Sequence, residues 1–285
     1  MTSTTRGLVL DADAAIDLQM HTTFSDGKWT PEQLTDHLVR EGFALGAITD
    51  HEGVDIAEEL QRVAAERSFP LLIAAELSAA WRGEPTDTLC FGFDPTHPSL
   101  RDVARDIARR QSENTRKVWE YLCAQGRLQP DERALERILE APSAQQPHEL
   151  FRILLDIFDE DRPAASAAIN AAGLAFETAD IAEVVEATHQ SGGVCLIAHP
   201  GRGDMWLCFD AQLLDELRRE VPIDGLEAHY PKHTPEQTAL YVAYAQGHHL
   251  LTSSGSDSHD PSRPPIRYQA ALSRDLLERL GVRVR

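Results

Sequence analysis

Six short apolar runs recur along the chain, and segments with helical spacing separate most of them. The runs are rich in Ile, Leu and Val and read AIDLQ, LGAIT, LLIAA, VCLIA, DGLEA and LLTSS. Short strands that alternate with helices are typical of parallel β/α units. The pattern therefore predicts an α/β protein built around a mainly parallel sheet.

Two of the intervening helices carry the same start signal. The string Thr-Pro-Glu-Gln begins at Thr30 and again at Thr234. In each copy Thr is suited to the N-cap, Pro to the first helical position and Gln to the third, which together form a capping box. Helices are therefore expected to start directly after Thr30 and Thr234.

The pattern changes in the middle of the chain. From about Ser99 to Ala172 the strand-like runs disappear, and Arg, Glu, Ala and Leu follow helical spacing with breaks at Pro residues. This predicts a helical insertion over residues 99–172, with residues 1–98 and 173–285 forming the catalytic core. A chain of 285 residues with 42% hydrophobic residues is long enough for both.

The charge and the cysteines restrict the partners and the location. A net charge of -19 opposes binding to duplex nucleic acid, which needs a broad cationic surface. The four cysteines form no C-x-x-C pair, which predicts reduced thiols in a cytoplasmic protein. No segment approaches about 18 continuous apolar residues, so no membrane partner is expected. The sequence gives no prediction of the oligomeric state.

Polar side chains follow five of the apolar runs. They are Gln19, His21 and Asp26; Asp50 and His51; Glu76; His199; and Asp257 and His259. Because the carboxyl ends of parallel strands meet at one face, these side chains are expected to gather there. Imidazole mixed with carboxylate, without thiolate, suits Mn, Zn or Fe. The donors outnumber those that one catalytic zinc uses, so two or three divalent metal ions are expected, which would activate water and neutralise phosphoryl charge.

Five ordered motifs carry a resemblance to a known family. The strings DLQMHTTFSDG, TDH, AAELS, IAHPGR and GSDSH resemble the polymerase-and-histidinol-phosphatase (PHP) family, in particular the branch that includes the 3',5'-nucleotide bisphosphate phosphatases. The similarity covers nearly the whole chain outside the insertion. It implies a distorted seven-stranded β/α barrel, a helical insertion that serves as a cap, a cluster of up to three ions and the hydrolysis of a phosphate ester.

The resemblance also implies roles for individual residues. It assigns Gln19, His21, Glu76 and Asp257 to one ion, Glu76 and His199 to a second, and Asp26, His51 and His259 to a third. Arg202 and His233 are similar to the catalytic groups that hold the substrate phosphate, and His148 is a possible contribution of the insertion to substrate binding. Asp50 and Glu227 are expected to lie behind the ligands and orient them.

The chain departs from the family at Gln19. Relatives usually read D-L-H-x-H after the first strand, and the first His is replaced here by Gln19. The amide oxygen of Gln is neutral and is a weaker donor than imidazole for Zn or Mn. The cluster could accordingly hold two ions, or hold a third weakly, or the protein could have lost turnover.

The expected substrate is a small phosphorylated metabolite. The leading class is a nucleotide, as a 3',5'-bisphosphate or as a short oligonucleotide end, and histidinol phosphate is the nearest alternative within the same chemistry. Two further readings stay open: an amidohydrolase-type C–N hydrolase, because a barrel with His and Asp ligands supports that reaction too, and an impaired relative that binds a phosphorylated ligand. The motifs of phosphate-binding loops, dinucleotide sites and serine hydrolases are absent from the sequence.

Overall fold

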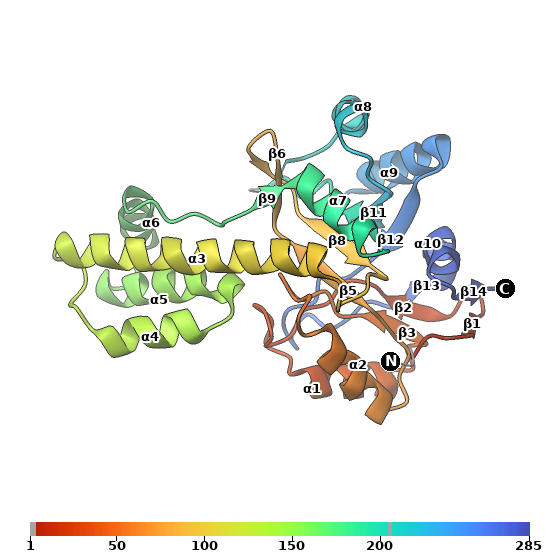
Figure 1. Ribbon diagram of the computed structural model, residues 1–285, viewed down its shortest axis with the longest axis horizontal. Helices are drawn as coiled ribbons and strands as arrows, with labels where there is room; N and C mark the ends of the chain where they lie inside the picture. Colours follow the sequence, from red (N-terminus) through yellow and green to blue (C-terminus); the bar gives the residue numbers. More distant parts are fainter. Residues whose placement is uncertain (1–3, 205–206) are drawn as a thin grey trace. The chain divides into compact units, whose positions relative to one another are not determined.

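The computed structural model describes residues 4–204 and 207–285. The chain forms two compact units (Figure 1). Unit 1 comprises Met1–Ala104 and Thr178–Arg285, and unit 2 comprises Arg105–Glu177. None of the helices in the described ranges combines the length and the apolarity that a membrane span requires.

Unit 1 contains all the strands of the described chain. They are β1 (Val9–Leu10), β2 (Ala15–Asp17), β3 (Leu45–Ala47), β4 (Leu71–Leu72), β5 (Ala74–Leu77), β6 (Ala79–Trp81), β7 (Glu84–Pro85), β8 (Thr88–Phe91), β9 (Ala179–Asp180), β10 (Val194–Ile197), β11 (Gly225–His229), β12 (Leu251–Ser254), β13 (Tyr268–Gln269) and β14 (Arg283–Val284). The larger sheets have the strand orders β12-β11-β10-β8-β5 and β13-β2-β3-β4. Smaller sheets pair β1 with β14, and β6 with β7 and β9.

Helices connect and cover these strands. They are α1 (Pro31–Arg40), α2 (Ala57–Glu66), α7 (Ile181–Gln190), α8 (Ala211–Glu220), α9 (Pro235–His248), η2 (Ala270–Ser273) and α10 (Arg274–Arg279). Helix α7 packs on β10 and β8, and α9 packs on β11 and β12. Unit 1 is therefore a mixed α/β structure, as the sequence predicts.

All six predicted runs contain strands, and most of their pairings are parallel. Strand β2 pairs in parallel with β3, β3 with β4, β10 with β11, and β11 with β12. Strand β8 is the exception, because it runs antiparallel to both β5 and β10. Its first residue, Thr88, therefore lies opposite Leu77 and Ile197, at the carboxyl ends of the neighbouring strands.

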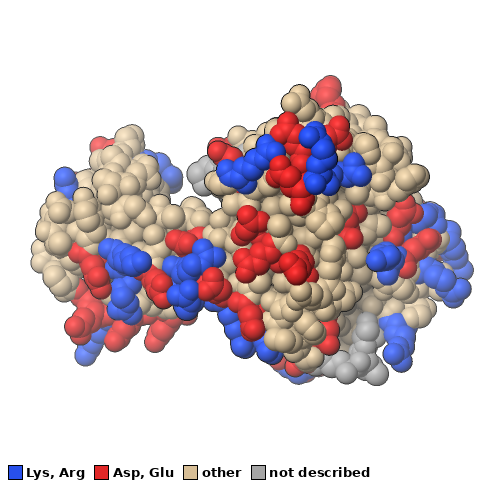
Figure 2. All heavy atoms as spheres, turned by 45° about the horizontal axis from the view of Figure 1, so that its top comes forward, with Lys and Arg blue, Asp and Glu red and all other residues tan. Residues whose placement is uncertain are grey.

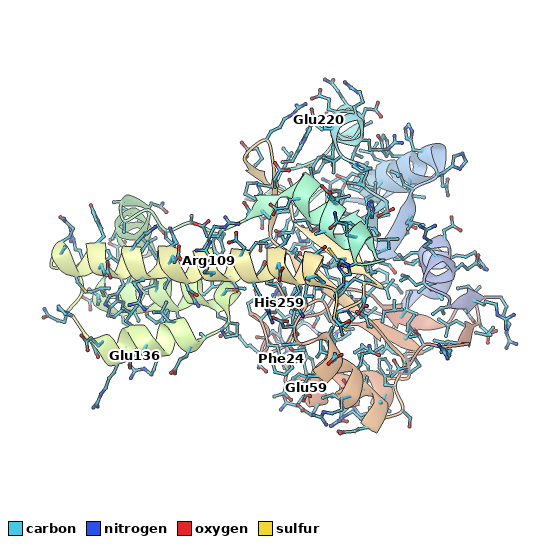
Figure 3. All side chains as sticks on the ribbon, in the orientation of Figure 1. Phe24, Glu59, Arg109, Glu136, Glu220 and His259 are labelled. Carbon is cyan, nitrogen blue, oxygen red and sulfur yellow. The ribbon has the colours of Figure 1, made fainter. Side chains whose placement is uncertain are left out.

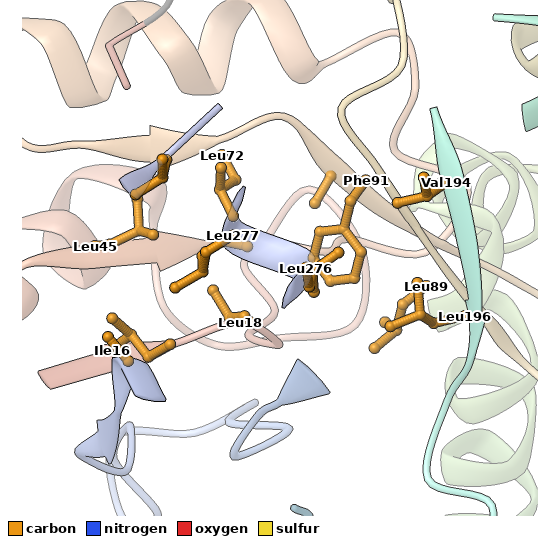
Figure 4. Close-up of a cluster of buried hydrophobic side chains, with 14 of the residues drawn as sticks. Ile16, Leu18, Leu45, Leu72, Leu89, Phe91, Val194, Leu196, Leu276 and Leu277 are labelled. Carbon is orange, nitrogen blue, oxygen red and sulfur yellow. The ribbon is translucent and has the colours of Figure 1, made fainter. Parts of the chain in front are cut away.

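The interior of unit 1 is apolar, and alternate residues of its strands fill it (Figure 4). Ile16, Leu45, Leu89 and Leu196 come from four strands and are fully buried. Burial of each such side chain stabilises the fold by about 1.5–3 kcal/mol. The intervening Cys90 is also buried and accepts a hydrogen bond from the Thr188 hydroxyl on α7 (3.2 Å). All four cysteines are free thiols.

Both predicted capping boxes are confirmed. Thr30 Oγ1 accepts a hydrogen bond from the Gln33 backbone N (3.2 Å), and Gln33 Oε1 accepts one from the Thr30 backbone N (3.1 Å).

We expect Thr30→Ala to lower the stability of the protein by about 1 kcal/mol, because the first turn of α1 then loses a partner for a backbone N–H. Urea unfolding measures this loss. Gln33→Glu keeps the box and serves as the control; an unchanged midpoint for Thr30→Ala would contradict the prediction.

Unit 2 is a separate bundle of helices. Helix α3 (Pro98–Ala124) begins in unit 1 and continues into unit 2, where α4 (Glu132–Glu140), η1 (Ser143–Gln145), α5 (Gln146–Ile157) and α6 (Arg162–Ala171) follow. The bundle has its own core, which includes Trp119, Leu150 and Leu154. Gln111 of α3 accepts from the Glu177 N (2.9 Å) and donates to the Ala175 carbonyl (3.1 Å), so the returning segment is tied to α3.

Candidate metal centre

The loop after β2 is fixed by one buried carboxylate. Asp50 accepts hydrogen bonds from the Thr22 N (2.7 Å), the Thr22 hydroxyl (2.6 Å) and the Ser25 hydroxyl (2.6 Å). A Cβ on Gly27 would lie 2.5 Å from the His21 carbonyl, so this position requires glycine. Asp50 thus positions the loop that carries His21, and its predicted role in orienting metal ligands stays a prediction.

Three overlapping groups of ligand-type side chains meet at the carboxyl ends of the strands. The groups are His21, Asp26, His51 and His259; His21, Glu76 and Asp257; and Glu76, Asp87 and His199. Within each group the ligand atoms lie within 4.8 Å of one another. Isolated parallel bridges, Met20↔Ser258 and His51↔Glu76, bring the strand ends together. Seven of the eight sequence-predicted ligands therefore converge in these groups, and the eighth, Gln19, contacts one of their members.

Glu76 and His21 lie at the centre of the cluster. His21 Nε2 is 3.1 Å from Glu76 Oε2 and 3.3 Å from Asp257 Oδ1. His199 Nε2 is 3.1 Å from the other oxygen of Glu76, Oε1. Glu76 thus faces imidazoles on both sides, as a carboxylate that bridges two cations would.

Asp26 and the stacked imidazoles complete the cluster. Asp26 Oδ1 is 3.2 Å from His259 Nε2 and 3.7 Å from His21 Nδ1. The His21 ring is stacked between the rings of His259, with centroids 4.0 Å apart, and His51, with centroids 4.9 Å apart. His21 is fully buried, so its two nitrogens face these groups and not solvent.

The cluster fits cations better than it fits hydrogen bonds. Among the described residues, His21 Nδ1 and Nε2 and His51 Nδ1 are buried and have no hydrogen-bond partner. Buried polar atoms are nearly always satisfied, and three such atoms in one place require an explanation. Bound cations provide it, because imidazole nitrogens and carboxylate oxygens at these spacings can share an ion.

The acidic and imidazole groups also stabilise each other's charged forms. Burial alone would lower the pKa of His51, but Glu76 and Asp26 more than offset it and raise the pKa to about 9. Burial likewise lowers the pKa of His21, yet Asp257 and Glu76 hold it well above its usual range. Burial would raise the pKa of Glu76, but His51, His199 and His21 keep it well below its usual range.

These pKa values predict that metal binding releases protons. At pH 7.5 the imidazoles of His21 and His51 are protonated in the metal-free protein, and each must be neutral to bind a cation. We expect Mn²⁺ binding at this pH to release about two protons, and the affinity to rise with pH up to about 9. Calorimetry in buffers with different ionisation enthalpies measures the release. Binding without proton release would contradict the prediction, because it would mean that His21 and His51 are neutral before the ion binds or are not its ligands.

Gln19 and Glu227 lie directly behind the cluster. Gln19 Nε2 donates to Glu76 Oε2 (2.8 Å), and both side chains are buried. Glu227 Oε2 accepts from the His199 N (3.0 Å) and so fixes the backbone of that residue. Burial, together with Asp257 and Glu76, raises the pKa of Glu227 well above its usual range.

The structure places Arg202 beside the cluster and gives His233 a positioning role. Arg202 Nη1 is 3.9 Å from Asp257 Oδ2, and its Nε is 3.0 Å from Asp204 Oδ1. His233 Nε2 accepts from the Gly201 N (3.1 Å), and its Nδ1 faces the Ala228 carbonyl (3.3 Å). Both ring nitrogens are thus engaged with the backbone, and burial lowers the pKa of His233 to about 4. His233 therefore holds the loop of Arg202, and its predicted contact with the substrate phosphate stays a prediction.

His148 belongs to unit 2, whereas the three ligand groups belong to unit 1. It is an exposed residue of α5, and its ring centroid is 5.7 Å from that of Phe176. Its predicted contribution to substrate binding stays a prediction.

Two residues of the centre were not predicted from the sequence. Asp87 is buried, and its Oδ2 is 4.0 Å from His199 Nε2. It precedes β8 instead of following it, and the reversal of β8 brings it to the same face as the other ligands. Tyr230 donates from its hydroxyl to Asp257 Oδ2 (3.2 Å). The sequence feature that could have indicated Tyr230 is its position directly after the apolar run DGLEA and His229.

Backbone strain is concentrated at the same place. His199 has φ 28° and Asp257 has φ 54°, in the left-handed region that side-chain-bearing residues rarely adopt. Such conformations persist where the surrounding structure imposes them, and they gather at functional sites. Here they direct two ligand-type side chains into the cluster.

Comparison of the sequence with known proteins identifies phosphoesterases. No protein-family model matches the chain. It is 28% identical over 253 residues to the 3',5'-nucleoside bisphosphate phosphatase of Chromobacterium violaceum, covering 87% of this chain and 88% of the relative. It is 25% identical over 248 residues to the 5'-3' exoribonuclease of Haemophilus influenzae, covering 86% and 90%.

Comparison with solved structures gives the same result for the fold. A protein of Bifidobacterium adolescentis described as a metal-dependent phosphoesterase superposes with a TM-score of 0.76 at 24% identity, covering 93% of this chain and 96% of the other. A Chromobacterium violaceum protein described as an amidohydrolase, solved with sulfate and without metal, gives 0.74 at 25% identity, covering 93% and 97%. The chain is thus a homologue of a nucleoside bisphosphate phosphatase and of 5'-3' exoribonucleases, with the fold of a metal-dependent phosphoesterase, which confirms the resemblance to the PHP family.

Proposed function

We propose that this protein is a metal-dependent phosphoesterase that removes phosphate from a small nucleotide, either a 3',5'-bisphosphate or a short oligonucleotide end. The observation that carries the proposal is the set of three ligand groups that share His21 and Glu76. Such an arrangement suits two or three divalent cations close together, which is the architecture of many phosphoester hydrolases.

The donors favour particular ions and roles. In the proposal, one ion is held by His21, Glu76 and Asp257 together with Gln19. A second ion is held by Glu76 and His199, beside Asp87. A third ion is held by Asp26, His51 and His259. The mixture of imidazole and carboxylate favours Mn, Zn or Fe. Such ions, when bound, activate water and neutralise the charge on the phosphoryl group.

We propose that Arg202 binds the phosphate group of the substrate. Its side chain is 19% exposed, so the guanidinium is accessible while Asp204 and Asp257 limit its orientations. A guanidinium binds two phosphate oxygens at once through its parallel N–H groups. His233 supports this role by holding Gly201, the residue that precedes Arg202.

The charge of the protein favours a small substrate. Figure 2 shows Lys and Arg side chains interspersed with Asp and Glu, and around α8 the basic Arg82 pairs with Glu216 and Glu220. With a net charge of -19 this surface suits a mononucleotide or a short end better than duplex nucleic acid. The sulfate in the Chromobacterium violaceum structure and the names of the two relatives agree with a phosphorylated ligand. The free cysteines support the expected cytoplasmic location.

We also infer that the two larger sheets of unit 1 form one distorted seven-stranded barrel. The bridge Met20↔Ser258 places the end of β2 beside the end of β12, and His51↔Glu76 places the end of β3 beside β5. With the regular pairings, neighbours then follow in the order β2, β3, β5, β8, β10, β11, β12 and β2 again. Such closure would explain why the ligands of both sheets meet at one face.

The direct test is phosphate release from adenosine 3',5'-bisphosphate by the Mn²⁺-supplied protein. We expect release that chelator abolishes and that His51→Ala removes. Release of ammonia or an acid from amide substrates, without phosphate release, would favour the amidohydrolase-type reaction, which the name of one structural relative suggests. Bound ions and bound nucleotide without any release would identify an impaired relative.

Phe24 offers a separate test of the nucleotide assignment. It lies between His21 and Asp26 in the sequence, and the residue is 37% exposed although Asp50 fixes its loop. The same loop donates from the Lys28 N to the His259 carbonyl (2.7 Å), and Figure 3 labels both Phe24 and His259. Because a nucleobase stacks on an exposed aromatic ring, we expect Phe24→Leu to raise KM for adenosine 3',5'-bisphosphate about fivefold or more.

The control for Phe24 is a substrate without a base. The variant should hydrolyse ribose 3,5-bisphosphate with an unchanged kcat/KM, since that substrate has nothing to stack. Equal losses on both substrates would show that Phe24 supports the loop and does not bind a base.

A further inference from the structure

Gln19 is the position at which the ligand set departs from the usual imidazole, and its amide contacts the centre of the cluster. The amide N donates to Glu76 Oε2 (2.8 Å), and Glu76 Oε2 is also 3.1 Å from His21 Nε2. In this orientation the Gln19 amide N faces Glu76, one of the proposed ligands of the first ion. An amide N has no lone pair available to bind a cation. Two oxygen ligands of one cation also lie about 3 Å apart, so this spacing equally suits an amide oxygen in the same place.

The opposite side of the same amide is unsatisfied. Within the described residues, Gln19 Oε1 and Glu227 Oε1 are buried acceptors without a hydrogen-bond partner. The Gln19 Cβ and the Glu227 carboxylate both approach Gly255: a Cβ on Gly255 would lie 2.4 Å from Gln19 Cβ and 2.6 Å from Glu227 Oε1. Glycine at position 255 therefore leaves room for the start of the Gln19 side chain and for the Glu227 carboxylate.

With the Glu227 carboxylate ionised, a form that bound cations at the cluster favour, a half-turn of the Gln19 amide would satisfy both sides. The turn exchanges the positions of oxygen and nitrogen and needs no other movement. In the arrangement that we infer, the nitrogen would donate to the unpaired oxygen of Glu227, and the oxygen would face the position shared by His21, Glu76 and Asp257. Glu227 Oε2 is fixed by the His199 N (3.0 Å), so its carboxylate is held in place to receive the amide.

We propose that Glu227 is a positioning residue that holds the Gln19 amide with its oxygen toward the first cation, and that this oxygen donor shifts the preference of the site away from Zn²⁺ and toward Mn²⁺. The inference rests on the metal centre of the proposed function but not on its substrate. The selectivity follows because the site then has one imidazole and three oxygen donors, and carbonyl and carboxylate oxygens suit Mn²⁺ better than they suit Zn²⁺.

The experiment measures Mn²⁺ binding to the full chain without substrate. Metal-free protein is dialysed against graded Mn²⁺, bound ions are counted by plasma emission, and free Mn²⁺ is followed by electron paramagnetic resonance. We expect Glu227→Gln to weaken the binding of one ion about 10- to 100-fold, since the new amide N–H donates to Gln19 Oε1 and holds the wrong side toward the cation. Gln19→Leu should weaken the same ion, and the double variant should bind no more weakly than Gln19→Leu alone.

Two further variants sharpen the result. Asp224→Asn changes a carboxylate just before β11, at the opposite end of that strand from the cluster, and should leave every Mn²⁺ affinity unchanged. Gln19→His should raise the Zn²⁺ to Mn²⁺ ratio of bound metal by about 10-fold in competition dialysis. Thermal unfolding of the metal-free proteins identifies any variant that fails to fold, and the Gln19 variants then carry the test by themselves.

The inference is overturned if Glu227→Gln weakens Mn²⁺ binding as strongly in the Gln19→Leu background as in the original chain, or if neither substitution affects any ion. It is also overturned if Gln19→His leaves the metal preference unchanged. The substrate assignment fails separately: ion binding with this coupling but without phosphate release would reject the nucleotide proposal and keep the Gln19 inference.

Discussion

Replacement of Glu76 by Gln is expected to lower kcat/KM for phosphate release by about 10³-fold, because loss of several kcal/mol of charge stabilisation corresponds to that factor. Glu76 belongs to two of the three ligand groups, and its two oxygens face His21 and His199 at 3.1 Å each. Gln keeps the size of the side chain but removes its charge and one acceptor oxygen. The metal content should fall with the activity.

A matched surface change controls for general effects of the Glu76 substitution. Glu59 is an exposed carboxylate of α2 that pairs with Arg62, and Glu59→Gln should leave kcat/KM within about twofold, since exposed ion pairs contribute little. If Glu76→Gln kept a tenth of the activity or more, the shared carboxylate would not be the centre of the site.

The second large effect is expected for Arg202→Ala, which should lower kcat/KM about 10²- to 10³-fold without changing the number of bound ions. Arg202 is the cation beside Asp257 with an accessible guanidinium, and its loss removes the proposed contact with the nonbridging phosphate oxygens. Arg202→Lys should recover only part of the activity, because an ammonium group lacks the paired N–H donors. Steady-state kinetics and metal counting on the same preparations separate this effect from that of Glu76.

Arg82→Ala is the control for Arg202. Arg82 is half exposed and pairs with Glu216 and Glu220 of α8, so its removal should leave both kcat/KM and the ion count unchanged. Inhibition by inorganic phosphate gives an independent measure: Arg202→Ala should weaken it, and Arg82→Ala should not. Equal inhibition of Arg202→Ala and the original chain would place the phosphate elsewhere.

Local patterns in the sequence were sufficient to predict many features of the fold. The runs AIDLQ and VCLIA contain β2 and β10 as expected, because a short apolar segment between helical patterns has few alternatives to a buried strand. The Thr-Pro-Glu-Gln strings start α1 and α9 as expected, since a capping box is a contact between residues three apart. Such features depend on neighbours in the chain and are therefore visible in it.

Features that depend on strand direction or on distant contacts were not predictable. Asp87 precedes the apolar run TLCF, and only the antiparallel pairing of β8 with β5 and β10 brings it to the ligand face. The sequence of β8 contains nothing that specifies its direction. The contacts of His233 with the Gly201 N and the Ala228 carbonyl likewise arise from tertiary structure, so the sequence could not indicate them.

The three hydrogen bonds to Asp50 have a consequence for the rate at which ions exchange. They hold Thr22 and Ser25 of the loop that carries His21 without any help from a cation. This part of the ligand set therefore keeps its shape after chelation, and an entering ion has little chain entropy to remove from it. Reloading of metal should accordingly be rapid, so that the occupancy of the site is restored as soon as free metal returns to its surroundings.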